Sequence, residues 1–311
     1  MISSAMTKRR RRWPWILLIL LGASCAGIYA LTGTAASPGP DYTIDLGALH
    51  AAATGHGPLP ERIEVERVGD FAFPRALVVA GEGFRLHPMV LLAHRVLWPE
   101  DHGNVRSVVI DTAMGPEGAK KIPGAHADLA ALARLEAAMT KAEAIVCTHE
   151  HTDHVGGLAV APDPSAIVKR VFLTREQLES PRLERDDFPP DTLKQLQPLD
   201  YQGLHSVAPG VVLQKAPGHS PGSQLVYVEL QSGQRYLFVG DIAWSRDNIT
   251  SGRGRPYIAK LLMGEDRAGV AAQLKAFARL PSDVHLVIAH DPTALASDLA
   301  AGLYRQGFSD L

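Results

Sequence analysis

The stretch Thr148-His149-Glu150-His151-Thr152-Asp153-His154 decides how the rest of this 311-residue chain is interpreted. It continues the short apolar run 144–148, which predicts a buried strand, so the polar residues begin a loop at the end of that strand. Three imidazoles and a carboxylate within six residues are the ligand types that zinc and other borderline divalent metals prefer. A solvated polar loop would not need three histidines. We therefore interpret the stretch as a metal-binding loop.

Three later positions extend the pattern. His219 lies in the tight turn Pro217-Gly-His-Ser-Pro-Gly222, Asp241 ends the apolar run that begins at Phe238, and His290 ends the run that begins at Ile288. An isolated histidine at a strand end is usually structural or lies on the surface. Their occurrence in this order, after the first cluster, favours a shared site.

This series resembles the metallo-β-lactamase-fold hydrolases. Their signature is a His-x-His-x-Asp-His loop, then a lone His, a bridging Asp and a final His, and all seven positions match over a body of residues 63–303. The resemblance implies an α/β fold, a four-layer αββα sandwich with a two-metal site at the sheet edge. It also implies the ligands: one metal is held by His149, His151 and His219, the other by Asp153, His154 and His290, and both by the bridging Asp241.

The implied chemistry is metal-assisted hydrolysis with two Zn²⁺ per chain, iron or manganese being the alternatives. Two such ions lower the pKa of a shared water to near neutrality and polarise the substrate oxygen. By the same resemblance Asp153 is also catalytic, orienting the nucleophile or assisting proton transfer. Asp111, after the strand-like run 107–110, matches an aspartate that in this family orients the ligand loop, and the resemblance implies the same role here; a helix or turn cap is its alternative role.

The segment after Asp241 is expected to rim the metals. The candidate substrate contacts in it are Trp244, Arg246, Arg255 and Tyr257. An arginine there could pair with an anionic group of the substrate, although arginines in loops are more often solvated.

Differences from particular subfamilies of these hydrolases narrow the range of expected substrates. The carboxylate of Asp241 argues against true β-lactamases, which carry another residue there, and only 21 residues follow His290, too few for the helical region of glyoxalase II-like enzymes. What remains is a hydrolase of small esters, lactones or phosphodiesters. Two alternatives stay open: a mononuclear iron enzyme resembling persulfide dioxygenases, and a non-catalytic metal-holding protein of the same fold.

Charge is distributed unevenly along the chain. Lys8 and Arg9–Arg12 contribute +5 to a net charge of −2, which leaves −7 for the rest. An acidic body is a poor match for a phosphate backbone, so we expect a small-molecule substrate and no nucleic acid. The two cysteines, Cys25 and Cys147, cannot build a disulfide framework.

The N-terminus is predicted to be a targeting segment. The uncharged apolar run 13–31 is just long enough to cross a bilayer, and Thr34-Ala-Ala36 could serve as a cleavage site. The basic cluster before it would stay in the cytoplasm and the body would be exported. The protein is then either anchored in the inner membrane with an extracytoplasmic domain, or secreted after cleavage.

We predict three regions: a basic and apolar signal or anchor segment in residues 1–36, a linker in 37–60 and the hydrolase domain in 61–311. Alternation and apolar runs predict strands at 62–68, 76–80, 89–92, 107–110, 144–148, 171–174, 211–213, 225–228, 236–239 and 286–289. Helical spacing predicts helices within 127–142 and around 270–277, and Asp291-Pro292 predicts the start of a last helix. The remaining histidines are expected to be structural or to lie on the surface: His50, His56, His87, His94, His102, His126, His205 and His285.

Overall fold

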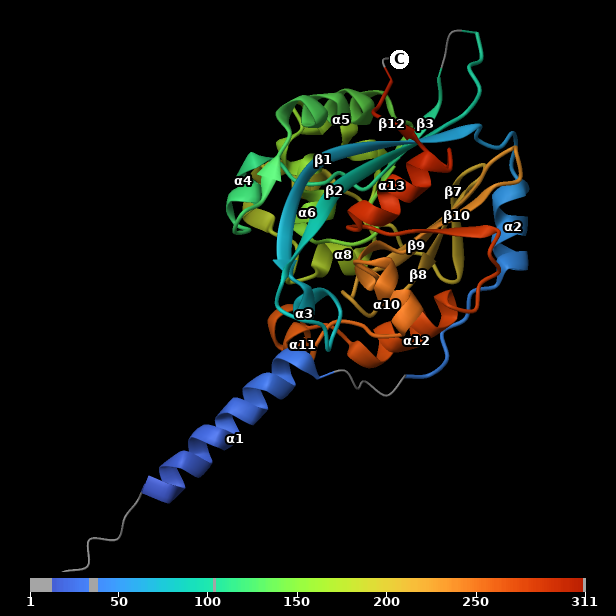
Figure 1. The fold of residues 1–311 in the computed structure, drawn as a ribbon. Coiled ribbons are helices and arrows are strands. Elements are labelled where there is room, and N and C mark those ends of the chain that lie inside the picture. Colours follow the sequence, from blue (N-terminus) through green and yellow to red (C-terminus); the bar gives the residue numbers. More distant parts are fainter. Residues whose placement is uncertain (1–12, 34–38, 103–104, 310–311) are drawn as a thin grey trace, which may run out of the picture.

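The computed structural model describes residues 13–33, 39–102, 105–309 of the chain (Figure 1). The basic cluster Lys8–Arg12 and the candidate cleavage site at 34–36 lie outside the described residues.

The first sheet has, among the described residues, seven strands. Their order is β12-β1-β2-β3-β5-β6, with β4 pairing with β1. The strands β1, β2 and β3 are antiparallel neighbours, whereas β3, β5 and β6 run parallel. The bounds are β1 Arg62–Pro74, β2 Leu86–Leu97, β3 Ser107–Ile110, β4 His126–Ala127, β5 Ala144–Val146, β6 Val171–Phe172 and β12 Arg305–Gln306.

The second sheet, within the same described ranges, has five strands in the order β11-β10-β9-β8-β7. Its neighbours are antiparallel except β10 and β11, which run parallel. The bounds are β7 Leu204–Ala208, β8 Val211–Lys215, β9 Gln224–Glu229, β10 Arg235–Phe238 and β11 Val284–Val287.

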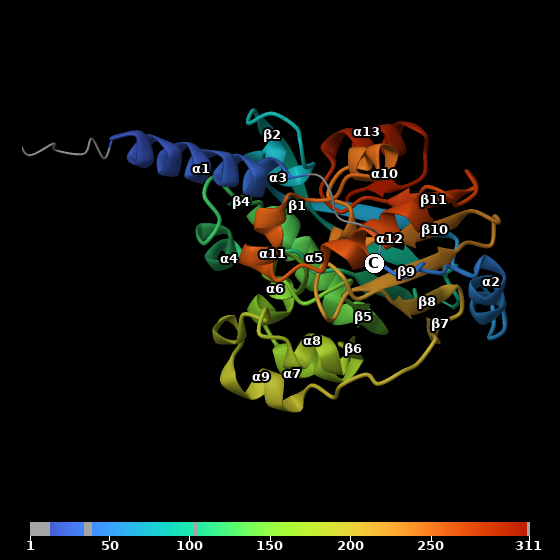
Figure 2. The ribbon, with the colours of Figure 1, turned by 90° about the horizontal axis from the view of Figure 1, so that it is seen from below.

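The two sheets pack face to face and each carries helices on its outer side (Figures 1 and 2). Alternation along the strands sets this arrangement: in β3, Val108 packs between the sheets while Val109 packs under the outer helices. In β9, Val226 packs between the sheets and Leu225 packs outward. Both faces of each sheet are thus buried, which explains the continuous apolar runs. The predicted αββα sandwich is confirmed.

The helices divide between the two outer layers. Those that contribute to the apolar core over the first sheet are α4 Pro116–Lys120, α5 Leu129–Lys141, α6 Thr152–Val160, α7 Pro164–Ile167, α8 Arg175–Glu179 and α9 Pro190–Gln195. Those over the second sheet are α2 Leu46–Thr54, α10 Arg246–Ser251 and α12 Arg267–Phe277. The helix α13 Pro292–Ala300 contacts β2 and packs against the core between the sheets, and Asp291 caps it through its side chain, as predicted. The helix α11 Tyr257–Met263 contacts α1.

The strand predicted at 76–80 is wrong. Residues Arg75–Val78 form the short helix α3, and a loop then turns back into β2. The backbone N–H groups of Arg75 and Ala76 donate to the carbonyls of Arg85 and Gly83, which holds this turn closed. A short apolar run signals burial but does not distinguish a strand from a buried helical turn.

The region predicted as a linker contains a helix that the sequence pattern did not reveal. Asp45 caps α2 by accepting from the N–H of Ala48, and Leu49 and Ala53 are fully buried against the second sheet. The residues between 41 and 60 therefore belong physically to the sandwich.

The apolar run 13–31 forms the helix α1, Trp13–Thr32, which extends away from the body (Figure 1). Residues Trp13–Leu31 are the one candidate membrane span found among the described residues, by length and composition. A signal sequence has the same length and composition, so the helix fits both predicted fates of this segment, an anchor and a cleaved leader.

Candidate metal centre

The seven candidate ligands come from four segments at one edge of the sandwich, and two of the ligands, Asp153 and His154, lie in the first turn of α6. Parallel strands bring their carboxyl ends to the same edge, so the loop after β5 lies beside the residue that follows β3, and the residues after β10 and β11 lie beside each other. The turn between β8 and β9 supplies the remaining histidine. The ligands by loop are His149, His151, Asp153 and His154 after β5, His219 between β8 and β9, Asp241 after β10, and His290 after β11.

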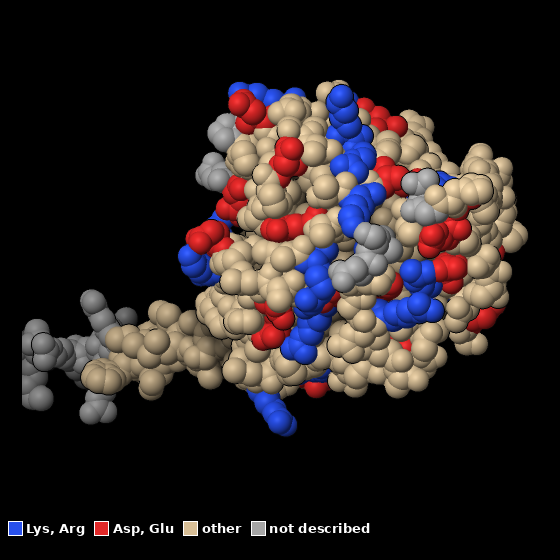
Figure 3. Space-filling model, turned by 90° about the horizontal axis from the view of Figure 1, so that it is seen from above, with Lys and Arg blue, Asp and Glu red and all other residues tan. Residues whose placement is uncertain are grey.

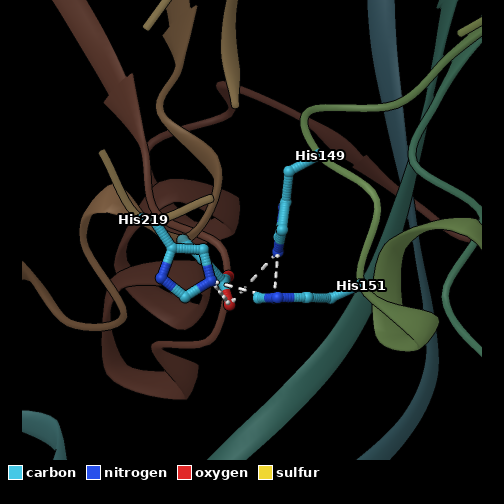
Figure 4. Close-up of side chains that lie close together, drawn as sticks. His149, His151 and His219 are labelled. Carbon is cyan, nitrogen blue, oxygen red and sulfur yellow. Dashed lines mark hydrogen bonds and ion pairs between the residues drawn. The ribbon is translucent and has the colours of Figure 1, made fainter. Parts of the chain in front are cut away.

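The first group gathers three imidazoles and one carboxylate oxygen. The Nδ1 atom of His151 lies 2.9 Å from Nε2 of His149 and 3.0 Å from Nε2 of His219. The Oδ2 atom of Asp241 lies 3.6 Å from Nε2 of His149 and 3.4 Å from Nε2 of His219. Figure 4 shows the three rings turning these nitrogens toward one another.

The second group uses the other oxygen of the same carboxylate. Oδ1 of Asp241 lies 3.1 Å from Nε2 of His154 and 2.9 Å from Nε2 of His290. Asp153 completes the group, with its Oδ2 atom 3.4 Å from Nε2 of His290 and 3.8 Å from that of His154. The two groups contain the same residues as the two ligand sets that the resemblance implies, and they meet at Asp241.

These atoms fit cations better than they fit one another. Ligands about 2.1 Å from a tetrahedral zinc stand about 3.4 Å apart, close to the separations in both groups. The Nδ1 atom of His151 faces two nitrogens, yet a ring nitrogen offers one hydrogen or one lone pair. In the second group Nε2 of His154, Nε2 of His290 and Oδ1 of Asp241 are buried without a properly aligned hydrogen-bond partner among the described residues. Such orphaned atoms are costly unless an ion satisfies them.

The electrostatics around His149 and His151 favour neutral imidazoles, the form that binds metal. Burial lowers the pKa of His149 and of His151 well below the ordinary value, and neighbouring imidazoles add to the effect. Burial would also raise the pKa of Asp241, but the histidines around it outweigh burial and hold it well below its usual range. A carboxylate at the junction of the two groups is therefore ionised.

In the second group nearby carboxylates dominate. Burial lowers the pKa of His154 and His290, but Asp241 and, for His154, Asp111 outweigh it, so that both values are raised. Protons would then compete with a cation for these two nitrogens.

Asp111 contacts the ligand loop as the sequence analysis expects. Its carboxylate accepts from the N–H of Thr148 at 2.6 Å and lies 2.9 Å from Nδ1 of His154. A hydrogen on that Nδ1 leaves the lone pair of Nε2 for the site. Asp111 has φ 58°, in the left-handed region that Asp and Asn tolerate better than most residues.

Gly240 allows Asp241 to approach the same loop. Its φ is 51°, and a Cβ at this position would lie 2.8 Å from Cβ of Thr148. A side chain would force the two loops apart.

The ring nitrogens of His219 and His290 that face away from the site also have partners. Nδ1 of His290 lies 2.8 Å from the carbonyl oxygen of Val90, and Nδ1 of His219 lies 3.2 Å from Oε2 of Glu265. Burial would raise the pKa of Glu265, but Arg255 and His219 outweigh burial and lower it. Each contact fixes the ring so that Nε2 faces the site.

The predicted substrate contacts occupy different places. Trp244 is buried, with its ring centroid 6.4 Å from that of His219 and 6.1 Å from that of His290. Arg246 is half exposed and forms an ion pair with the buried Asp298. Tyr257 begins α11, with its ring 6.5 Å from that of Tyr29 in α1.

The expectation that Arg255 lies on the rim needs correction. Its side chain is 1% exposed, pairs with Glu265 and stacks over the ring of Trp244. A buried guanidinium survives only when it is paired. This arginine supports His219 from behind both through Glu265 and directly, since its Nη2 atom lies 3.0 Å from Nδ1 of His219.

Sequence reasoning missed Glu265 and Glu150. Glu265 follows a helix end without any motif to mark it. Glu150 stands between two of the histidines, is fully buried and accepts from Oγ of Ser220 at 2.8 Å, which ties the ligand loop to the turn that carries His219. Its place inside the motif was the available signal.

Comparison with known proteins places this arrangement in a wider group. The family model of the metallo-beta-lactamase superfamily matches residues 102–290. N-acyl homoserine lactonase AiiA of Bacillus thuringiensis subsp. kurstaki is 31% identical over 108 residues, and the N-acyl homoserine lactonase of Bacillus cereus is 29% identical over 105 residues. Each match covers 34% of this chain and 40% of the relative, well under the relative's full length.

Solved structures resemble about three quarters of the chain. An N-acyl homoserine lactone hydrolase, determined with the product N-hexanoyl-L-homoserine at its catalytic metal centre, superposes with a TM-score of 0.57 at 17% identity, covering 77% of this chain and 96% of that one. AidC, a dizinc quorum-quenching lactonase, gives a TM-score of 0.51 at 17% identity, covering 75% and 89%. At such identities the likeness establishes the fold.

Proposed function

The chain belongs to the metallo-beta-lactamase superfamily, and from that premise we propose that it is a metal-dependent hydrolase of small lactones or related esters. The observation that carries the proposal is the position of Asp241, whose two oxygens face two separate ligand groups. The likeness to N-acyl homoserine lactonases over a third of the chain supports a lactone as the first substrate to test.

We assign one cation to His149, His151 and His219 and a second to Asp153, His154 and His290, with Asp241 shared between them. Imidazole and carboxylate donors at tetrahedral spacing suit zinc. Two bound cations would activate a water as the nucleophile and polarise the carbonyl of the substrate.

Asp153 is the proposed proton carrier. Its side chain is 17% exposed, whereas that of Asp241 is 2% exposed, so among the carboxylates of the two groups Asp153 is the more accessible to substrate. From its place beside His290 it can accept the proton of the attacking water and return it to the leaving alkoxide. Asp111 and Glu265 act only through the histidines that they orient.

Trp244 is the proposed substrate contact with the best support. Its indole Nε1 is buried and has no hydrogen-bond partner in the described part of the chain, and its ring lies beside His219 and His290. A donor in that position suits an oxygen of the substrate. Arg246 and Tyr257 stay predictions for the rim.

We also propose that residues 13–31 anchor the chain in a membrane, with the hydrolase domain, residues 61–311, on the extracytoplasmic side. The support is the apolar helix of spanning length and the basic cluster that precedes it.

The test uses the full chain in lipid nanodiscs, loaded with zinc. N-hexanoyl-homoserine lactone, a simple ester, a phosphodiester and a β-lactam are offered in parallel, with Asp241→Ala as the matched control. We expect ring opening of the lactone that a chelator abolishes and added zinc restores. A chelator-resistant activity, or no hydrolysis of any lactone or ester by metal-loaded protein, would contradict the proposal.

A further inference from the structure

Large apolar side chains that are exposed gather at one end of the body. Outside α1, the described residues include five highly exposed large hydrophobics, and four of them are Phe84, Leu86, Leu261 and Leu262, each 62–65% exposed. The fifth, Leu129, begins α5 at the end of the molecule remote from α1 (Figure 1). We call the four residues the apolar end.

The apolar end surrounds the place where α1 leaves the body. The helix α1 contacts α3 and α11, and Figure 2 shows the three side by side. Leu261 and Leu262 belong to α11. Phe84 lies in the turn whose backbone is bonded to α3, and Leu86 begins β2 directly after that turn. The carbonyl oxygen of Gly33, directly after α1, accepts from Arg267, which fixes the junction.

The two parts of the apolar end form one surface. Arg253 donates to the carbonyl of Ala80 at 2.9 Å and pairs with Glu82 at 2.5 Å, and the N–H of Ala80 donates to the carbonyl of Gly254. The turn before β2 is thereby bonded to the segment that leads into α11. Such a surface is held in position and does not need a partner to form.

Exposed cations flank the apolar side chains. Arg85 lies between Phe84 and Leu86, and Lys260 directly precedes Leu261, and both are exposed. Apolar side chains interleaved with cations are typical of a surface that inserts shallowly among lipid headgroups. The face at the opposite end carries charged side chains of both signs (Figure 3).

We propose that the apolar end rests in the lipid surface of the membrane that α1 spans. The inference relies on the proposed anchoring, because a helix of 20 residues is about 30 Å long, which matches the hydrocarbon core and brings its last residues to the headgroup level. Phe84, Leu86, Leu261 and Leu262 then lie at the depth where apolar side chains are favoured.

The contact would also place the metal centre close to the lipid. In the sequence, α11 lies between Arg255 and Glu265, the ion pair that contacts His219 from behind. Near the end of α11, Arg182 donates to the carbonyl of Leu262. An amphiphilic substrate that partitions into the bilayer would arrive beside this segment.

The experiment measures contact with lipid directly. The full chain is reconstituted in phosphatidylcholine vesicles that contain lipid-borne nitroxide quenchers, and a fluorescent label is attached to single cysteines. Cys147 is fully buried and will not react, so the native Cys25 in α1 reports the anchor. In a Cys25→Ser background, Phe84→Cys and Leu262→Cys report the apolar end, and Leu129→Cys is the control of equal exposure.

We expect strong quenching at Cys25 by deep nitroxides, and quenching by shallow nitroxides at Phe84→Cys and Leu262→Cys that clearly exceeds that at Leu129→Cys. Adding Leu261→Ser should weaken the signal at Phe84→Cys, because both belong to one surface. Quenching at Cys25 with none above the control at the apolar end would overturn the docking and leave the anchor intact. Concentration-dependent protection of the two labels in detergent would show that a second copy covers the face, and would also overturn it.

Discussion

Two buried polar clusters in this molecule lie at similar depth and differ in how completely their atoms are paired. Near the C-terminus, Glu64 accepts from Nε of Arg95 at 3.1 Å, from its Nη2 at 2.5 Å, and from both the N–H and the hydroxyl of Ser309. Arg95 also donates to the carbonyl of Ser309. Both charged side chains are only 2% exposed, yet they satisfy each other.

The cluster around Asp241 has the same depth and many more titratable groups, but its atoms converge without pairing. Oδ1 of Asp241 lies near two ring nitrogens that form no aligned hydrogen bond with it. The comparison teaches that burial and charge alone do not mark a functional site. Atoms that point at a common centre and leave one another unsatisfied do mark one.

The largest effect is expected from Asp241→Ala. Removing the shared carboxylate leaves both groups one ligand short, so the bound metal and lactone hydrolysis should be lost together, with kcat/KM falling about a thousandfold or more. Metal content by elemental analysis and initial rates on the same preparation measure this. A variant that keeps full metal content and activity would contradict the shared role of Asp241.

Breaking the other cluster should act on stability instead. Arg95→Met leaves Glu64 buried without its cation, which should lower the free energy of unfolding by about 3–5 kcal/mol. Metal content per folded chain should be unchanged, because Arg95 touches none of the ligands. Denaturant unfolding measures the stability, and metal analysis of the folded fraction measures the metal content. A loss of metal at unchanged stability would contradict the assignment of Arg95 to stability rather than to the metal centre.

Asp111→Ala should have an intermediate effect. Without its carboxylate the ring of His154 loses its orientation, and metal affinity should fall by about 10–100-fold. Asp111→Asn keeps an acceptor and tolerates the positive φ, so it should recover part of the affinity. Competition with a chelator gives the affinities. Equal affinities for wild type and Asp111→Ala would mean that this contact is merely structural.

The smallest effect concerns pH. Burial would raise the pKa of Glu64, but Arg95 and Ser309 outweigh burial and hold it below the ordinary value of 4.5. A carboxyl whose pKa is lower when folded stabilises the protein above its unfolded pKa, and this contribution is lost as the pH falls through the folded value. The stability gap between wild type and Glu64→Gln should therefore be widest near neutral pH and narrow below 4.5. Unfolding curves across this range test it, and a gap that widens in acid would refute it.

Much of the site could be predicted because its ligands occur in a fixed order after strand-like runs. The His149–His154 loop needed only local spacing, and the parallel pairing of β3 with β5 and of β10 with β11 brings the distant residues to one edge. The resemblance also pointed to Asp111, which matches the family's aspartate at the end of an early strand.

What escaped prediction depends on contacts between segments far apart in sequence. The sequence around Arg255 is typical of an exposed loop. Its burial depends on the ion pair with Glu265, and no sequence motif marks Glu265. The apolar run at 76–80 signals burial equally for a strand and for α3. Burial of α2 depends on the second sheet, which its own sequence does not reveal.

Anomalous diffraction at the zinc edge from crystals of the zinc-loaded chain tests the central claim most directly. We predict two peaks, one among His149, His151 and His219 and one among Asp153, His154 and His290, with one oxygen of Asp241 directed at each. One peak alone, or peaks elsewhere with these side chains bonded only to one another, would contradict the account.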